Sequence, residues 1–315
     1  MHTANLSGSP TAYRLFNGAA SGLDGVAIDK YNAHYQIQFF NKNLIEREKE
    51  LVQMLKNDFS PEFIAVKYRF INNSQIKAVF GNNSKTIVEE YGCKFHVDLM
   101  DTLNPGLFLD MRDARHNFAL HCKEKEMLNL FAYTCSFSVH ARKNGAIKAV
   151  NVDISKKNLR RGKENYLLNG IEPKQGEFFC GSSEEYIDWC IKKGKRFGAI
   201  VIDPPSFAKN GKKTFSVATD YENLATKAAS LLESSGALFL ATNYSEWSNE
   251  TLRKTAQNAF ARNGKKCKIL AEGTQGIDFP GTGESKESSM VYLLLLSTSD
   301  TTPSQLQLCG ASQAE

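Results

Sequence analysis

Apolar and polar residues alternate along much of the first ninety positions of the chain. The stretches GVAIDKYNAHYQIQFF (25–40) and EFIAVKYRF (62–70) follow the period of two that half-buried β-strands have, with a hairpin turn at Asn32. Between these stretches, residues 42–57 place their apolar side chains on one helical stripe. The pattern therefore predicts a small α+β unit over residues 1–90.

A different rhythm begins near Glu126, where apolar runs of strand length alternate with helical stripes. The apolar runs are residues 127–133, 146–153, 176–180, 197–203, 237–242, 266–273 and 289–296. The alternation predicts right-handed crossover connections and a mainly parallel sheet with helices on both faces. We therefore predict an α/β domain over residues 111–297, joined to the first unit by a hairpin linker at 91–110. The stretch 298–315, rich in Ser, Thr and Gln, is expected to be disordered.

The composition is that of a globular protein with a mild excess of positive charge. Hydrophobic residues make up 42% and charged residues 23% of the chain, and the formal net charge is +5. This charge permits a nucleic-acid partner without requiring one. The longest apolar run, residues 290–296, is far shorter than the ~20 residues of a membrane span, and the N-terminus lacks the apolar core of a signal peptide. We expect a soluble, cytoplasmic protein with no membrane partner.

The cysteines give no sign of a covalent or metal framework. Seven of them are scattered along the chain, and none belongs to a Cys-x-x-Cys pair. Both the spacing and the odd number argue against disulfides and against a structural zinc site. We expect reduced thiols and no bound metal.

In a parallel α/β sheet, ligands bind beyond the carboxyl ends of the strands. The first strand of the large domain is followed by FAYTCSFS (131–138), which lacks the Gly-x-Gly-x-x-Gly pattern that brings backbone close to a pyrophosphate. The small residues Ala132, Thr134 and Ser136 suit a ligand without phosphates, such as a nucleoside linked to an amino acid. An ordinary strand-to-helix turn is the alternative.

The second strand ends at Asp153, about 20 residues further along the chain. A carboxylate at this place can accept hydrogen bonds from both hydroxyls of a ribose. An acid favoured by the dipole of the next helix is an equally good interpretation. Ser155, at the start of that helix, is expected to be its cap.

The fourth strand runs into Asp203, Pro204, Pro205, Ser206 and Phe207. The two prolines hold the backbone rigid and leave carbonyl groups unused by the sheet. A carboxylate and such a carbonyl can accept hydrogen bonds from an exocyclic amino group, while the Phe207 ring can stack on a base. Asn243 ends the fifth strand, and its amide can donate to and accept from a base edge, although it could also only form a turn.

Basic residues follow this turn directly. Lys209, Lys212 and Lys213 lie where a nucleic-acid backbone would pass, although most basic runs are only solvated surface. Phosphate contacts at such residues would position a substrate without reading its sequence. Upstream, the segment NPGLFLDMRDAR (104–115) contains Arg112, which is a second candidate for a phosphate contact and equally well a structural partner of an acid.

These motifs, taken in order, resemble the class I S-adenosylmethionine-dependent methyltransferases, and specifically the bacterial large-subunit rRNA methyltransferases of the RlmI and RlmK/L types. The resemblance spans nearly the whole chain to about Ser297. It rests on NLFAYTCSFSVHA (129–141), VNVDIS (150–155), VIDPPSFA (201–208), GLFLDMRDAR (106–115), RLFNGAASGLDGVAIDKY (14–31) and DFPGTGESKESSMVYLLL (278–295).

The resemblance implies a seven-stranded Rossmann-like sheet with a smaller N-terminal α+β domain, and S-adenosyl-L-methionine bound across the strand ends. It implies ribosomal RNA of the large subunit, or its precursor, as the substrate. The acid of the family at the end of its second strand falls on Asp153. We assign cofactor contacts to Phe131, Ala132, Tyr133, Thr134, Ser136, Asp153, Ile154, Ser182, Ser183 and Asp203. We assign the base pocket and catalysis to Asp203, Pro204, Pro205, Phe207 and Asn243.

The sequence departs from the family pattern at three places. Cys135 replaces a glycine in the first turn, which is expected to put a side chain where the backbone approaches the cofactor. The third strand is followed by Cys180, Gly181, Ser182 and Ser183 without an acid, so adenine contacts are expected from backbone amides or Ser hydroxyls. Members of the RlmI type often begin with an RNA-binding PUA domain, which this sequence does not show, so RNA is expected to be held more weakly or by other parts.

The methylated atom is expected to be a purine nitrogen, such as N7 of guanine. Methylation at C5 of a pyrimidine needs a thiolate that adds at C6, and the end of the fifth strand (ATNYS, 241–245) has no cysteine. Cys135 and Cys180 belong to other strand ends and are expected to face the cofactor. The alternatives are cytosine C5 methylation, a nicotinamide-dependent oxidoreductase, and a non-catalytic RNA-binding protein. A homodimer is compatible with the sequence.

Overall fold

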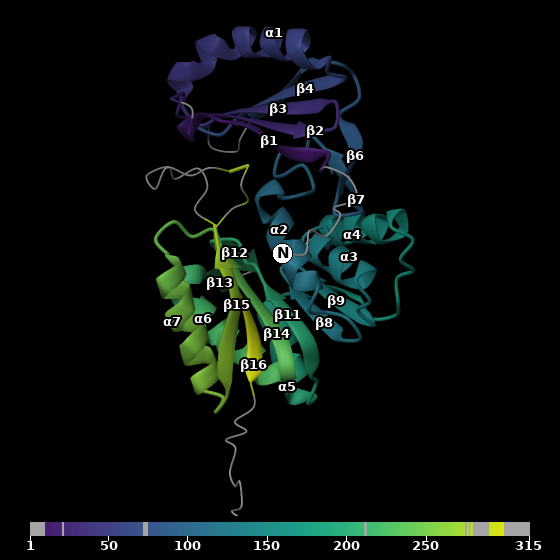
Figure 1. Cartoon of the computed structure of the whole chain (residues 1–315), viewed down its shortest axis with the longest axis vertical. Helices are drawn as coiled ribbons and strands as arrows, with labels where there is room; N and C mark the ends of the chain where they lie inside the picture. The colour runs from purple at the N-terminus through teal and green to yellow at the C-terminus, as the bar shows by residue number, and fades with distance from the viewer. Residues whose placement is uncertain are drawn as a thin grey trace, which may run out of the picture.

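The computed structural model describes residues 10–20, 22–71, 75–210, 213–274, 276, 278–279 and 290–298. Two units are visible (Figure 1): a small one, coloured purple and blue, and a larger one that contains the green and yellow parts of the chain. The small unit lies beyond the end of the large sheet at which strands β12 and β13 are placed. No helix of the described ranges is long and apolar enough to cross a membrane.

The small unit is built on a five-stranded sheet. Its order is β1-β2-β3-β4-β5, formed by Ala12–Asn17, Val26–Tyr31, His34–Phe39, Phe63–Tyr68 and Gln75–Phe80. The hairpin turn expected at Asn32 is present, with Tyr31 paired to His34 and a φ of 55° at Asn32. Helix α1 (Glu48–Phe59), which follows the 3-10 helix η2 (Lys42–Arg47), connects the parallel strands β3 and β4.

Helix α1 covers one face of this sheet. Leu51 and Leu55 of the helix are buried with Ile37 of β3 and Val66 of β4 in one apolar cluster. The opposite face carries Ala65 and more polar side chains, and it is turned toward the rest of the molecule. Alternation along each strand therefore gives the sheet one apolar face and one mixed face.

A hairpin connects the two units. Strands β6 (Lys85–Glu90) and β7 (Cys93–Asp98) pair with each other and form a separate two-stranded sheet. The boundary expected after residue 90 therefore falls in the turn of this hairpin. The 3-10 helix η3 (Leu109–Met111) and helix α2 (Arg112–Ala119) then lead into the large unit.

The large sheet has seven strands in the order β10-β9-β8-β11-β14-β16-β15. The strands are β8 Glu126–Leu130, β9 Lys148–Asp153, β10 Phe178–Cys180, β11 Phe197–Ile202, β14 Leu232–Thr242, β15 Lys266–Gly273 and β16 Val291–Thr298. The first five in spatial order are parallel, and β16 runs antiparallel to both of its neighbours. The predicted seven-stranded α/β sheet is confirmed.

Helices cover both faces of this sheet. They are α3 Ser136–Lys143, α4 Lys156–Leu168, α5 Ser183–Lys192, α6 Val217–Leu231 and α7 Asn249–Ala261. One face packs on α2 and α3 through a cluster that includes Phe118, Phe137 and Phe239. The other face packs on α5, α6 and α7. Ser155, Ser182 and Ser248 cap α4, α5 and α7 with side-chain oxygens, as local polar residues at helix starts should.

The segment after Asp203 differs from the expected basic loop. Strands β12 (Phe207–Asn210) and β13 (Lys213–Ser216) form a two-stranded antiparallel hairpin. Phe215 is buried in the core beside Phe131, and this anchor explains why the segment leaves the sheet as an ordered ribbon. The predicted disordered tail lies outside the described residues, apart from Thr298 at the end of β16.

The two units are locked together by a buried ionic cluster. Glu90 of the hairpin accepts hydrogen bonds from Arg115 at 2.7 and 2.8 Å and lies 2.9 Å from Nε2 of His140. All three side chains are at most 2% exposed. Burial alone would raise the pKa of Glu90, but the Arg115 charge and the His140 contact outweigh it and lower the pKa to about 2.

We expect the Glu90→Gln substitution to lower the free energy of unfolding by ~3–5 kcal/mol, because it leaves the Arg115 charge buried without a counter-ion. Since the folded-state pKa lies below the ordinary carboxyl value, the contribution of Glu90 is present at neutral pH and is lost as the pH falls from 4.5 toward about 2. Urea unfolding at a series of pH values measures both effects. Glu250→Gln, which breaks an exposed pair with Lys254, is the control and should change little. An equal effect of the two substitutions would contradict the assignment.

Candidate cofactor and base-binding site

The carboxyl ends of the parallel strands meet at one edge of the large sheet. Because β8, β9, β11 and β14 are parallel, the residues that follow them lie at the same edge. Phe131, Asp153, Asp203 and Asn243 therefore share the edge that the sequence indicated. Hydrogen bonds join some of these strand ends directly.

The turn after β8 has an unusual backbone. Phe131, Tyr133 and Cys135 have φ angles of 57°, 49° and 62°, the left-handed region that favours glycine. The amide of Phe131 donates to Ser183 Oγ at 3.1 Å, and the amide of Tyr133 donates to Asp153 Oδ2 at 2.8 Å. Three such residues within five positions are unusual, and strained backbone is common at ligand-binding turns, so this turn is a candidate ligand site.

Asp153 connects this turn to the start of α4. Its Oδ1 accepts from the Ser155 amide at 2.8 Å and from Asn158 Nδ2 at 3.3 Å, and its Oδ2 accepts from Tyr133. Burial raises the pKa of Asp153, and the donated amide hydrogen bonds oppose that rise. A carboxylate has about four acceptor positions, so one position on Oδ2 remains for a ligand hydroxyl. Beside it, the Ile154 side chain is exposed.

Cys135 does not lie where the sequence suggested. Its side chain is fully buried in the cluster that contains Leu159 and Tyr166, and it faces Gly162 of α4. A Cβ on Gly162 would come within 2.3 Å of Cys135 Sγ, so the glycine of α4 makes the room that the missing glycine of the turn would have left. The expectation that this thiol faces the cofactor is wrong.

The other polar side chains of the turn are engaged with the protein. Thr134 Oγ1 donates to the Gly106 carbonyl at 2.6 Å, and the Tyr133 hydroxyl donates to the Asn104 carbonyl at 3.1 Å. These bonds tie the turn to the linker before α2. From this turn, backbone groups and the Ala132 and Ser136 positions are what a ligand can contact.

After β10, Ser182 and Ser183 stand where many members of the family have an acid. Ser182 Oγ accepts from the Glu185 amide and donates to Glu184, while Ser183 Oγ holds the Phe131 amide. Both hydroxyls are therefore already hydrogen-bonded to protein groups near the turn. Cys180 is exposed, and its Sγ lies 3.5 Å from the Ile154 carbonyl.

Asp203 is the acid that emerges from β11. Burial, and to a smaller extent the nearby Asp110 carboxylate, raise its pKa to about 7, and the Arg115 charge opposes the rise. No hydrogen bond to its carboxylate comes from the residues that the structure describes. Asp110, whose carbonyl accepts from the Gly276 amide at 3.2 Å, is thus a second acid at this edge, and the sequence patterns did not assign it to the site.

Aromatic rings stand beside the two prolines. Phe207 is 63% exposed and meets Tyr244 edge to face, with 6.5 Å between the ring centroids. Ser206 Oγ donates to Asn243 Oδ1 at 3.0 Å, which joins the ends of β11 and β14. The sequence analysis missed Tyr244, although an aromatic residue directly after Asn243 was a visible signal. Pro204 is buried and Pro205 is exposed.

The basic residues of this region are only partly described. Lys209 lies on β12 opposite Thr214, and Lys213 lies on β13 opposite Asn210. Both backbones are therefore on the hairpin next to Phe207. Lys212 lies outside the described residues.

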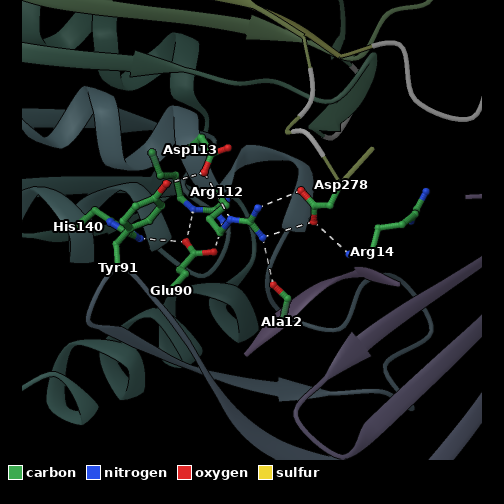
Figure 2. A network of polar contacts seen from close by, with 9 residues as sticks. Ala12, Arg14, Glu90, Tyr91, Arg112, Asp113, His140 and Asp278 are labelled. Atoms are coloured by element: carbon green, nitrogen blue, oxygen red, sulfur yellow. Dashed lines mark hydrogen bonds and ion pairs between the residues drawn. The ribbon is translucent and has the colours of Figure 1, made fainter. Parts of the chain in front are cut away.

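Arg112 is held inside the protein, as Figure 2 shows. Its side chain is 9% exposed, Nη2 lies 3.0 Å from Asp278 Oδ1, and Nη1 lies 3.4 Å from the Ala12 carbonyl. Asp278 also accepts from the backbone amide of Arg14 at 3.1 Å. A phosphate could reach Arg112 only by displacing Asp278, so the geometry favours a role in joining the two units.

Comparison with known proteins decides the family. The sequence profile of the S-adenosylmethionine-dependent methyltransferases matches residues 58–264, more than half of the chain. The chain belongs to this family. The expected class of enzyme and its cofactor, S-adenosyl-L-methionine, are confirmed, and a nicotinamide-dependent oxidoreductase is not supported.

Individual relatives cover most of this methyltransferase. YwbD of Bacillus subtilis, by its name a candidate ribosomal RNA large subunit methyltransferase, is 31% identical over 294 residues, 91% of this chain and 74% of its own. Ribosomal RNA large subunit methyltransferase I of Vibrio cholerae is 28% identical over 281 residues, 86% of this chain and 70% of its own. SMU.776, a candidate methyltransferase crystallised with SAH, superposes with a TM-score of 0.82 at 27% identity and covers 91% of this chain and 75% of its own.

We expect Asp153→Asn to weaken S-adenosylmethionine binding about tenfold or more, because an ionised acceptor is lost at the turn. Isothermal titration calorimetry measures the dissociation constant. Ser155→Ala is the matched control, since it removes the α4 cap and costs ~1 kcal/mol of stability but leaves the carboxylate in place. Equal weakening by both substitutions would mean that a loosened helix start, and not the carboxylate, is responsible.

We expect Gly162→Ala to destabilise the methyltransferase by ~1–3 kcal/mol, because the added methyl group overlaps Cys135 Sγ. Adding Cys135→Gly should restore stability, since it removes the sulfur at a position whose φ of 62° suits glycine. Denaturant unfolding of both single variants and the double variant measures the coupling. A double variant no more stable than Gly162→Ala would rule out this packing explanation.

Proposed function

We propose that this enzyme methylates a purine nitrogen of large-subunit rRNA, with N7 of guanine as the favoured atom. The observation that carries the proposal is the set of side chains after β11 and β14. Asn243, Phe207 and Tyr244 lie there together, and residues 197–248 contain no cysteine. The names of the relatives support rRNA of the large subunit, or its precursor, as the substrate.

The nearby cysteines are poorly suited to pyrimidine C5 chemistry. That reaction needs a thiolate at the target base. Burial raises the pKa of the Cys135 thiol well above its ordinary value, so it is protonated at neutral pH and shielded from a base. Cys180 is the last residue of β10, and β9 and β8 lie between β10 and β11 in the sheet. Cytosine C5 methylation remains the second candidate only if one of these thiols can be moved to the base.

A purine nitrogen can react without a covalent enzyme intermediate. When bound, S-adenosylmethionine would supply the methyl group of its sulfonium. The N–C bond would form as the C–S bond breaks, so that S-adenosylhomocysteine leaves as the neutral thioether and the positive charge passes to the methylated base. The protein then has to position the base and exclude water. Phe207 would stack on the base, Asn243 and the Pro204 carbonyl would bond its edge, and Asp203 would accept from an amino group or, when protonated, donate to a carbonyl.

The described residues fit S-adenosylmethionine at the neighbouring positions. The free position on Asp153 Oδ2 would accept from a ribose hydroxyl, and Ile154 would cover one face of the adenine. The Phe131–Ser136 turn would face the amino-acid part through its backbone. Cys135 stands where the family has a glycine, and this difference was one reason to consider a non-catalytic protein. Its sulfur packs on Gly162, so the side chain does not block the backbone of the turn.

The division of labour between the units is part of the same proposal. The small unit, residues 1–90, and the β12–β13 hairpin with Lys209, Lys212 and Lys213 would contact RNA, and residues 111–297 would carry out methyl transfer. A base within a duplex would have to be flipped out, at a cost of a few kcal/mol. The homodimer and the cytoplasmic location stay predictions.

The experiment that tests this function incubates the purified enzyme with S-adenosylmethionine and large-subunit rRNA transcribed in vitro. Mass spectrometry of the digested nucleosides identifies the product, and reverse transcription locates it. Methylated guanosine is expected, with Cys180→Ser as active as the wild type. If 5-methylcytidine forms and Cys180→Ser abolishes it, the nitrogen assignment is wrong.

We expect Phe207→Ala to lower kcat/KM by about 10- to 100-fold, because stacking on a base contributes ~1–3 kcal/mol. Tyr244→Ala should have a smaller effect in the same direction, since Tyr244 supports Phe207 edge on. Trp189→Ala, which removes an exposed aromatic side chain from α5, is the control and should leave the rate unchanged. Initial rates on the same transcript give kcat/KM for each variant. If Trp189→Ala loses as much activity as Phe207→Ala, the stacking role of Phe207 is refuted.

A further inference from the structure

Two cationic side chains lie next to each other on the mixed face of the small sheet. Lys67 is near the end of β4, and Arg69 follows this strand directly. Ile64 and Val66 of β4 pack toward α1, whereas Phe63 and Ala65 belong to the cluster on the opposite face. Alternation along the strand therefore places Lys67 and Arg69 on the face turned toward the methyltransferase unit.

Lys67 is buried without an ion-pair partner among the described residues. Its Nζ donates to the Leu103 carbonyl at 2.7 Å, and the residue is 0% exposed. Burial, and to a smaller extent the Arg69 charge, lower its pKa to about 8, and the Asp101 charge opposes this. Lys67 thus adds positive potential that the described residues offset only in part.

Arg69 also has no ion-pair partner among the described residues, and it is more exposed than Lys67, so a ligand can reach it more easily. Its Nε donates to Gln38 Oε1 at 2.9 Å, which fixes the plane of the guanidinium. The nearest acid on this face, Asp29, is taken by Arg14, with 2.7 Å between Nε and Oδ1, and by Gln38 Nε2. Burial lowers the pKa of Arg69, and the charge of Asp29, which forms no ion pair with Arg69 within the described ranges, offsets this only in part.

This arrangement sets Arg69 apart from the other arginines. Within the described ranges, every arginine except Arg69 and Arg196 has a carboxylate within ion-pair distance. Arg196 is exposed and bonds only the Lys195 carbonyl. Arg69 is half-buried, so the missing negative charge matters energetically there and hardly matters at Arg196.

The position of this face relative to the site follows from the linker. Lys67 bonds the carbonyl of Leu103, and the next carbonyls, of Asn104 and Gly106, hold the side chains of the turn after β8. Tyr31, which lies on the same face as Asp29, is near enough to Arg69 for the guanidinium charge to lower its pKa, although burial raises that pKa more. The two cations are therefore close to the turn that we assign to the cofactor.

We propose that Arg69 binds a backbone phosphate of the RNA segment that carries the target base, with Lys67 adding potential behind it. The proposal rests on the rRNA substrate proposed above. A phosphate would provide the negative charge that no described carboxylate provides to Arg69 at ion-pair distance. The two terminal nitrogens of the guanidinium bond no described residue, so they can donate to two phosphate oxygens side by side. The phosphate would fix the RNA beside the turn without reading its sequence.

The test compares Arg69→Gln with Arg196→Gln, because Arg196 is the other arginine that has no carboxylate partner among the described residues. Filter binding of large-subunit rRNA transcript is measured over a series of KCl concentrations. For Arg69→Gln we expect a dissociation constant about tenfold higher and a salt dependence, log Kd against log[KCl], shallower by ~0.7–0.9. Arg196→Gln should match the wild type. An unchanged slope for Arg69→Gln, or the same change in both variants, would overturn the proposal.

Two further measurements separate this role from a structural one. Without RNA, Arg69→Gln should melt at the wild-type temperature or above it, because removing an uncompensated buried charge should not destabilise the fold. Its affinity for S-adenosylmethionine should be unchanged. A lower melting temperature with an unchanged salt slope, or weaker cofactor binding, would overturn the phosphate assignment. If the wild type transfers no methyl group but Arg69→Gln still loses the salt-dependent binding, the proposed function fails and the phosphate site stands.

Discussion

The structure depends on a short turn of backbone that is unfavourable by itself and is held in place from several directions. Phe131, Tyr133 and Cys135 all adopt the left-handed conformation, which costs non-glycine residues of the order of 1 kcal/mol each. Asp153 fixes one amide of the turn and Ser183 fixes another. Because these partners come from β9 and α5, the conformation of the turn depends on the packing of the sheet and its helices.

The same turn explains why the two units are not independent modules. The linker that holds its side chains is itself held by Lys67 of the small unit. On the other side, Arg112 reaches Asp278 between β15 and β16, and Asp278 bonds the backbone of Arg14. A displacement of the small sheet would therefore be felt at the turn through short, directional contacts. If the small unit binds RNA as proposed, these contacts would position the RNA relative to the candidate site.

The large sheet and its order of elements could be predicted from the sequence, since each strand and helix carries its own periodicity. The contacts that decide the site could not, because they join residues that no local pattern connects. The orientation of Cys135 is set by Gly162 on another helix, and the role of Arg112 by an acid 166 residues further along the chain. The ordered β12–β13 hairpin depends on burial of Phe215, which a basic, glycine-containing segment hides. Asn243 was identifiable because it follows β14 directly, and Phe207 because it comes soon after β11 in the Asp-Pro-Pro segment; Tyr244, the next residue after Asn243, could have been identified in the same way.

The ion pairs in the structure help to distinguish structural arginines from arginines that bind a ligand, and the sequence alone does not show these pairs. Arginines that build a fold are paired, because an unpaired buried cation loses solvation without any return. Arg14, Arg112 and Arg115 follow this rule at the junction of the two units. Arg69, on the same face as Arg14, forms no ion pair with a described residue, and the charge of Asp29 offsets the cost of its burial only in part. A protein that retains such an energetic cost at one position, next to its reactive turn, is using the position for a partner that arrives with its own negative charge. A polyanion such as RNA meets that requirement at every nucleotide.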